Sequence, residues 1–242
     1  MLLLNLEKNM PPKVITCHQP NFLPWLGFFA KLAQSDEMIL LDDVQFTQGI
    51  HNWTTRVKVL GPNGPFWLTI PIINCKSGFQ KIMDLRTFDD YRWTKKVIKT
   101  IESSYGKTKF YSETIPPIIE IIEGHTGLIC DTNIRLIEHI KKILKINTLI
   151  FKSSDIYSNQ SSNEKLIELI LSRNGGIYLS GNGASEYQDE RLYKSRGIEI
   201  EYSRFVHAEY PQLKKGAFYS GLSIIDALCS IGSDETRKMI CT

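Results

Sequence analysis

The sequence predicts an α/β fold, a Rossmann-like parallel sheet flanked by helices, with a β-hairpin and helical insertion. Residues 14–41 read as strand, polar loop, helix and strand, which is the order of a βαβ unit. Hairpin and helix patterns follow, and strands alternate with helices again after residue 148. We therefore expect a single α/β domain over residues 13–242, an insertion at about 50–146 and an N-terminal extension over 1–12.

The first βαβ unit follows the break at Pro11 and Pro12. Residues 14–17 form a short apolar run, which predicts a buried strand leading into the polar turn 18–21. Pro24 fits the first turn of a helix, because its missing N–H is not needed there. The second strand is expected at 38–41.

The insertion begins with a hairpin signal. Two β-rich runs, 55–59 and 66–70, are joined by a turn rich in glycine and proline. Amphipathic helices are predicted at 91–104, with Asp89 or Asp90 as N-cap, and at 127–144. A further helix at 115–122 is expected after Pro116 and Pro117.

The last third of the chain alternates between strands and helices. We expect strands at 148–151, 177–180 and 198–202 that continue the parallel sheet. Between them, a capping box of Ser161 and Glu164 predicts the start of one helix, and a second helix is expected at 185–195. The final helix should cover 223–231, with Gly232 as its stop.

The composition is that of a folded protein with nearly balanced charge. Hydrophobic residues make up 42% and aromatic residues 10%, which excludes a disordered chain. The net charge of +3 argues against binding of long nucleic acid and permits a small anionic ligand. The five cysteines form no CxxC pair, so neither a disulfide framework nor a zinc site is expected. No apolar run is long enough for a signal peptide or membrane span, and we expect a cytoplasmic protein without membrane insertion.

Polar side chains follow the first strand, at the edge where open α/β sheets bind ligands. His18, Gln19 and Asn21 stand before a helix whose free N–H groups attract anions. A histidine can act there as acid, base or phosphate donor, and the amides can donate hydrogen bonds. Alternatively, the three side chains cap the helix and hold the loop in place.

The second strand ends at Asp42 and Asp43, on the same edge of the sheet as His18. Neighbouring strand residues face opposite sides, so only one of these aspartates should face the site. Its carboxylate could orient His18, bind a sugar hydroxyl or hold magnesium through water, and local turn hydrogen bonding is an equal alternative. Gln45, in the same segment, is a candidate ligand-binding residue.

Basic and aromatic residues supply further candidates. Arg56 could grip a phosphate or carboxylate while Trp53 stacks on a base or sugar. Lys31, on the first helix, either contacts the ligand or is an ordinary surface lysine. Trp25 and Asn52 complete this group.

A glycine-rich segment follows the strand at 177–180. Gly181 and Gly183 let the backbone approach a ligand, and successive amides there could form an anion nest. The segment lacks the lysine of a P-loop, and a tight turn with Ser185 as N-cap is an equal alternative. The candidate ligand contacts in the last third of the chain are Ser180, Gly181, Gly183, Ser185, Tyr187, Tyr210 and Gln212. The histidines show no metal-ligand spacing, so no metal site is predicted, and the cofactor stays unknown.

Taken together, these segments resemble the WbqC-like family of bacterial proteins. The resemblance rests on seven segments in order along the chain: His18-Gln19-Pro20-Asn21, Pro24 to Phe28 with Lys31, Asp42 to Phe46, Trp67 to Pro71, Tyr178 to Gly181, Tyr210-Pro211-Gln212 and Leu222 to Asp226. In the family an asparagine directly precedes the arginine, whereas Trp53, Thr54 and Thr55 separate Asn52 from Arg56 here. The resemblance implies a role in the biosynthesis of O-antigen, lipopolysaccharide or another surface polysaccharide. The first strand and its helix also look like the nucleotide-binding half of nucleotidylyltransferases such as pantothenate synthetase, although Gly27 replaces a signature histidine.

Three hypotheses about function follow. In the first, a transferase moves an acyl or aminoacyl group to a nucleotide-linked amino sugar, with His18 as base and Asp42 or Asp43 orienting it. In the second, a nucleotidylyltransferase-like enzyme activates its substrate with a nucleoside triphosphate, which would require magnesium. In the third, the protein is a non-catalytic partner that binds a sugar nucleotide. The sequence leaves the donor, the acceptor and the oligomeric state open.

Overall fold

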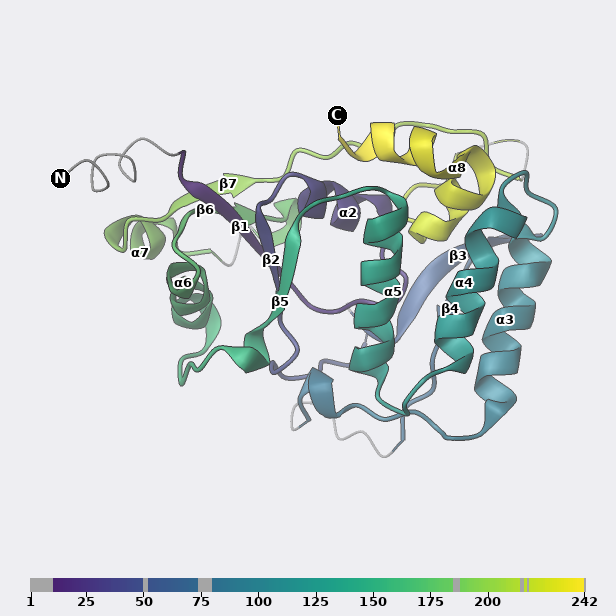
Figure 1. Cartoon of the computed structure of the whole chain (residues 1–242), viewed down its shortest axis with the longest axis horizontal. Coiled ribbons are helices and arrows are strands. Elements are labelled where there is room, and N and C mark those ends of the chain that lie inside the picture. The colour runs from purple at the N-terminus through teal and green to yellow at the C-terminus, as the bar shows by residue number, and fades with distance from the viewer. Residues whose placement is uncertain are drawn as a thin grey trace.

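The computed structural model describes residues 11–49, 52–73, 80–184, 188–213, 216 and 218–241. Within them, five parallel strands form one sheet and two antiparallel strands form a hairpin (Figure 1). The sheet strands are β1 (Lys13–His18), β2 (Glu37–Leu40), β5 (Leu149–Lys152), β6 (Gly175–Ser180) and β7 (Glu199–Tyr202). The hairpin strands are β3 (Arg56–Gly61) and β4 (Gly64–Thr69). The predicted α/β fold with a parallel sheet and a hairpin is confirmed.

The sheet reverses its direction of growth at β1. Its strand order is β5-β2-β1-β6-β7, so the chain starts in the centre, builds one side, and then crosses to build the other. β1 pairs in parallel with β2 and with β6, where Ile15 lies opposite Tyr178. Such a reversal leaves a crevice beyond the carboxyl ends of the two central strands, and open α/β sheets bind ligands there.

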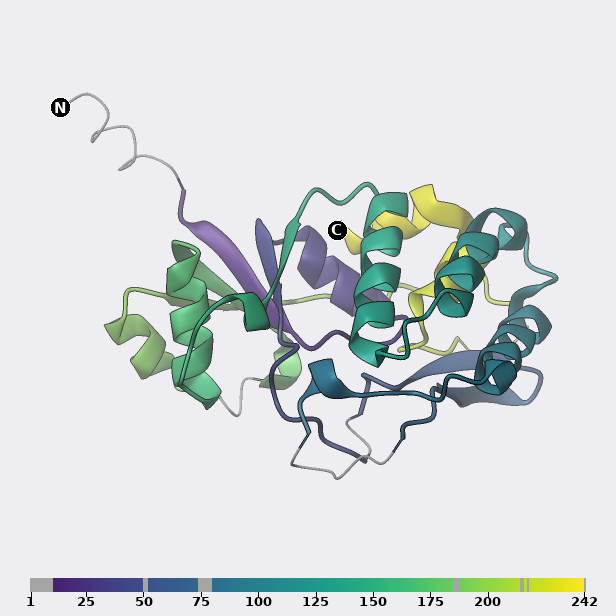
Figure 2. The ribbon, with the colours of Figure 1, turned by 60° about the horizontal axis from the view of Figure 1, so that its bottom comes forward.

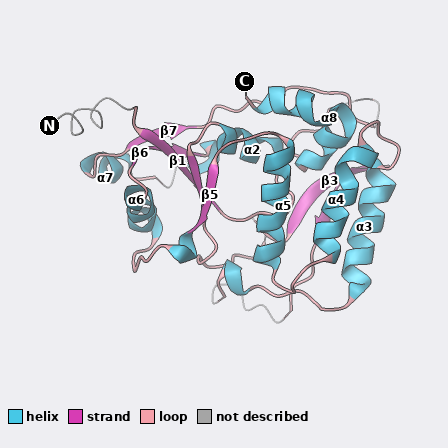
Figure 3. Ribbon diagram, viewed as in Figure 1, coloured by secondary structure: helices cyan, strands magenta, loops and turns pink. Residues whose placement is uncertain are grey.

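Helices cover both faces of the sheet (Figure 3). On one face, Ile15 and Cys17 pack with side chains of α6 (Ser162–Ser172) and α7 (Glu190–Ser195), such as Ile170 and Tyr193. Alternate strand residues such as Met38 and Leu40 face a larger core on the other side. That core also contains side chains of α2 (Leu26–Ala33), the hairpin, α3 (Tyr91–Tyr105), α4 (Tyr111–Glu123), α5 (Ile129–Ile143) and α8 (Ile224–Ile240). The segment between β2 and β5 therefore packs on the α2 side of the sheet.

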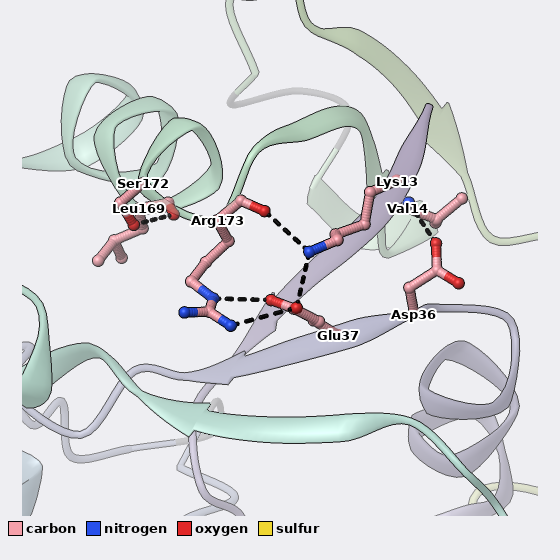
Figure 4. A network of polar contacts seen from close by, with 7 residues as sticks. All are labelled: Lys13, Val14, Asp36, Glu37, Leu169, Ser172 and Arg173. Carbon is pink, nitrogen blue, oxygen red and sulfur yellow. Dashed lines mark hydrogen bonds and ion pairs between the residues drawn. The ribbon is translucent and has the colours of Figure 1, made fainter. Parts of the chain in front are cut away.

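The N-terminal ends of the strands are held by a network of charges (Figure 4). The buried Glu37 carboxylate accepts hydrogen bonds from Lys13 Nζ at 2.9 Å and from Arg173 Nε at 2.8 Å. Lys13 also donates to the backbone carbonyl of Arg173 at 3.1 Å. These contacts tie β1, β2 and the end of α6 together at the edge opposite to the crevice.

Two predicted helix boundaries near prolines are wrong. α2 begins at Leu26 with Trp25 as its N-cap, so Pro24 precedes the helix instead of occupying its first turn. α4 begins at Tyr111 and carries Pro116 and Pro117 inside it, not before it. Both prolines lack a backbone donor, and burial of the isoleucines of α4 holds that helix together across the gap.

Two further helix starts differ from the prediction, and one predicted helix end is confirmed. Ser161 is the N-cap of α6, but its side chain makes no capping hydrogen bond, so the expected capping box is absent. α7 begins at Glu190 rather than 185, because Asp189 caps it by accepting a hydrogen bond from Leu192 N at 3.2 Å. Gly232 has the non-helical angles φ 82° and ψ 173°, so it ends the first helical segment of α8 as predicted, and a second segment follows it. Thr236 Oγ1 donates to the Gly232 carbonyl at 2.6 Å. In the described part of the chain, no helix is both long and apolar enough to cross a bilayer.

Candidate functional site

A cavity of about 500 Å³ lies at the carboxyl ends of β1 and β6, where the strand order reverses. Its walls come from the end of β1, from α2, and from the segments that follow β6 and β7. Seven residues proposed from the sequence line it: His18, Gln19, Trp25, Lys31, Ser180, Gly181 and Gly183. Segments far apart in the chain thus meet at one edge of the sheet, as the βαβ pattern indicated.

Lys31 is a buried cation in the wall of this cavity. Its side chain is 5% exposed, and its ammonium group donates to the backbone carbonyl of Cys17 at 3.0 Å. Among the described residues, no carboxylate forms an ion pair with it. Burial lowers the pKa of Lys31 to about 8, so it is mostly protonated at neutral pH. A charged ammonium with donors to spare favours an anionic ligand in the cavity.

His18 is a neutral histidine beside this cation. Its ring packs edge-on against Phe28 and Trp25, with centroids 4.9 and 5.7 Å away. Burial, and then the positive charge of Lys31, lowers the pKa of His18 to about 3. Nδ1 lies 3.0 Å from the backbone carbonyl of Gln19, and because a carbonyl only accepts, Nδ1 carries the hydrogen. Nε2 is therefore the ring nitrogen that can accept a proton.

The glycine-rich wall leaves open space. Gly181 and Gly183 do not adopt positive φ, and a Cβ atom added to either would meet nothing within 4 Å. Neither backbone conformation nor packing inside the chain therefore requires glycine at these positions. Ser180 is fully buried beside them, next to Tyr178. The wall thus offers room to a ligand.

Asp42 and Asp43 do not join His18 in the cavity. Asp42 is buried and accepts hydrogen bonds from Ser154 N at 2.9 Å and Ser154 Oγ at 2.6 Å. Asp43 accepts from Ser153 Oγ and from Lys165 Nζ, the latter at 2.5 Å. Burial alone would raise the pKa of Asp43, but these two hydrogen bonds outweigh it and lower the pKa. Both carboxylates hold the segment between β5 and α6, so their catalytic role stays a prediction without geometric support.

An aromatic row leads from the cavity to the hairpin. Ring centroids lie 5.1 Å apart for Trp25 and Trp53, and 5.2 Å apart for Trp53 and Trp67. The Arg56 guanidinium lies 4.3 Å from the centroid of Trp67 and donates to the backbone carbonyls of Gly49 and Asn52. Arg56 is half-buried and lies beyond the cavity, at the far end of this row.

The remaining candidates lie elsewhere. Tyr210 OH and Gln212 Nε2 donate to the fully buried Asp226 at 2.7 and 3.1 Å, which holds the segment before α8 in place. Burial raises the pKa of Asp226. Asn21 is buried outside the cavity, Asn52 bonds Thr55, and Gln45 is exposed. Ser185 and Tyr187 lie outside the described residues.

The sequence did not point to several residues of the cavity wall. Phe205 and His207 follow β7 in irregular backbone, and Asn182 lies between the two open glycines. The position of Asn182 within the glycine-rich segment was the available signal for it, whereas nothing local marks Phe205 or His207. Among the described residues, no cluster of three or more histidine, cysteine, aspartate or glutamate side chains could hold a metal ion.

The chain is similar to a known protein family and to a mycobacterial protein. The model of the WbqC-like protein family matches residues 19–238, which include the cavity-lining residues from Gln19 to His207 but not Cys17 and His18. The uncharacterized protein Rv1507c of Mycobacterium tuberculosis is 29% identical over 225 residues, covering 92% of this chain and 95% of that protein. No solved structure matches the chain.

Proposed function

The chain belongs to the WbqC-like protein family, and we propose that it is a transferase of bacterial surface-polysaccharide biosynthesis. Its substrate in this proposal is a nucleotide-linked amino sugar, and the transferred group is acyl or aminoacyl. The observation that carries the proposal is that the cavity at the strand reversal holds both a buried cation, Lys31, and a neutral histidine, His18. Lys31 can bind the diphosphate of a nucleotide sugar, and His18 can take a proton from an attacking amine.

The diphosphate would lie between Lys31 and the open wall at Gly181 and Gly183. An ammonium group screened from water attracts phosphate strongly, because the local dielectric is low. Glycines let the backbone N–H groups approach the phosphate oxygens closely. Burial is the larger cause of the low pKa of His18, and a bound dianion would raise this pKa by offsetting the second cause, the positive charge of Lys31. Substrate binding thereby makes His18 a stronger base.

The chemical step is addition and elimination at a carbonyl. The sugar amine attacks the carbonyl carbon of an acyl or aminoacyl ester or thioester, and a C–N bond forms. His18 Nε2 takes the proton that the amine loses. The bond from the carbonyl carbon to the leaving oxygen or sulfur then breaks, and His18 returns the proton to that atom.

This proposal is tested by binding and turnover with the full chain. A thermal-shift screen with nucleotide sugars, nucleoside triphosphates and acyl donors identifies binders, because a ligand of the native state raises the melting temperature. Mass spectrometry then detects the acylated or aminoacylated sugar. We expect His18→Gln to lower kcat by about 10²- to 10⁴-fold with little change in ligand binding.

The matched control is His139→Gln, on α5 and outside the cavity, which should retain wild-type turnover. Full activity of His18→Gln would remove the histidine from the mechanism. Release of pyrophosphate from a nucleoside triphosphate, with no acylated product, would replace the transferase proposal by nucleotidyl transfer.

A further inference from the structure

The solvent face of α3 carries a row of lysines, Lys95, Lys96 and Lys99, called here the lysine face. All three side chains are exposed, and none forms an ion pair with a described residue. Their spacing puts them on one side of the helix, opposite the buried Trp93 and Val97. α3 has a net charge of +3, which equals the net charge of the whole chain, so basic and acidic residues are equal in number outside it. The excess positive charge of the protein is thus concentrated on this helix.

Apolar side chains lie beside the lysine face. A groove of about 600 Å³ runs between α3 and the hairpin and is lined by Phe66 and Pro62 together with the three lysines. Phe66 is 39% exposed, and Tyr91, one helical turn before Lys95, is 65% exposed. Figures 1 and 2 show α3 at the end of the molecule away from α6 and α7, so this surface can meet a broad, flat partner.

We propose that the lysine face and Phe66 dock on a membrane surface that contains anionic phospholipid. Lysines are attracted to the negative headgroups, and aromatic rings are stabilised at the boundary between headgroups and acyl chains. A long nucleic acid is the less favoured partner, because the net charge of the chain is only +3. The docked protein lies on the bilayer and does not span it.

Vesicle co-sedimentation of the full chain tests this proposal. We expect binding to vesicles of equal parts phosphatidylcholine and phosphatidylglycerol, and none to phosphatidylcholine alone. The binding should weaken as salt is added. The triple variant K95Q/K96Q/K99Q should lower the partition coefficient about a hundredfold, since each of the three lysines contributes roughly fivefold. Phe66→Ser should lower it severalfold while all charges are kept. The three lysines are exposed, so the triple variant should melt like the wild type. Phe66 is 39% exposed and its ring packs close to Gly61, so its variant is assayed for binding at a temperature at which circular dichroism shows it to be folded.

The matched control removes the same charge elsewhere. K142Q/K145Q/K194Q replaces three exposed lysines on other surfaces and should bind vesicles like the wild type. Equal losses in the two triple variants would show that net charge alone drives binding and would overturn the proposal. So would a lack of binding to the anionic vesicles. Displacement from vesicles by inorganic phosphate, where sodium chloride at equal ionic strength displaces nothing, would assign the lysine face to a phosphate ligand instead. Binding of a single-stranded RNA through the same lysines would assign it to RNA.

Discussion

Lys31 is unusual at the scale of a single residue, because lysine is rarely buried without a carboxylate partner. α2 carries it on the side that faces β1, where the carbonyl of Cys17 satisfies one of its donors. The remaining N–H donors and the positive charge of the Lys31 ammonium group destabilise the unliganded protein, because they are buried. In the proposed function, an anion bound in the cavity would pair with this charge and relieve that destabilisation.

Lys31→Met tests this role directly. The variant keeps the length and apolar character of the side chain and removes the charge, so we expect nucleotide binding to weaken about 10- to 100-fold. The unliganded protein should be as stable as the wild type or more stable, because a buried unpaired charge has been removed. Calorimetric titration and thermal melting measure the two quantities. The control Lys142→Met, on an exposed part of α5, should leave binding unchanged. Unchanged binding by Lys31→Met would show that phosphate is held elsewhere.

Some of the site residues could be predicted from the sequence, and others could not. His18 and Gly181 each follow a strand directly, and the rule that parallel strands end at one edge brings them together. The same rule misplaced Asp42 and Asp43, because Ser153 and Ser154 capture both carboxylates. Those serines precede α6, more than a hundred residues later in the chain. A local pattern cannot report a hydrogen bond formed at that separation.

At the scale of elements, the hydrophobic periodicity predicted the strands and long helices correctly. The capping and turn residues predicted the ends of helices less well. All five sheet strands lie within two residues of their predicted bounds, because short apolar runs between polar turns are unambiguous. α4 contains two residues that usually end or kink a helix, Pro116 and Pro117. Tertiary packing overrides the local preference there, since Ile115 and Ile118 are fully buried. At Gly232 the local preference holds, because its non-helical φ and ψ divide α8 into two segments.

The Glu37 network gives a prediction at this scale, since it joins β1, β2 and the end of α6 (Figure 4). Burial would raise the pKa of Glu37, but hydrogen bonds from Arg173 and Lys13 outweigh it and lower the pKa. Glu37→Gln removes the negative charge and one of the two acceptor oxygens, and we expect the free energy of unfolding to fall by about 2–4 kcal/mol. Urea denaturation measures the change. Glu138→Gln, which breaks an exposed pair with Lys141, should cost less than about 0.5 kcal/mol. Equal effects of the two substitutions would show that the network is only a surface contact.

At the scale of the whole molecule, the buried cavity groups should shape the dependence of stability on pH. The folded pKa of His18 is about 3, below its ordinary value of 6.5, so only the unfolded chain takes up this proton as the pH falls between them. Stability is therefore lost over that window. The folded pKa of Lys31 is about 8, below 10.5, so the unfolded chain holds a proton there that the native state lacks. The titration of Lys31 therefore makes the free energy of unfolding increase as the pH rises above about 8.

Urea denaturation across pH checks both signs. Relative to the wild type, His18→Gln should be less sensitive to acid between pH 6.5 and 4. Lys31→Met should lack the alkaline gain, and the comparison with the wild type cancels the titration of cysteines and tyrosines. Parallel pH profiles for the wild type and both variants would show that the two groups titrate alike in the folded and unfolded states.

The position of β1 in the middle of the sheet also sets an order of events during synthesis. β1 is made first, but its partner on one side is β6, and Ile15 pairs there with Tyr178. At about 5–20 residues per second, the ribosome needs roughly ten to thirty seconds to produce that partner. During this interval one edge of a buried, apolar strand has no strand beside it, which is the kind of edge that promotes aggregation. Half of the cavity wall is likewise missing until β6 has been made. Chains that terminate before β6 would therefore lack the site and expose the central strand, which makes them substrates for chaperones and proteases.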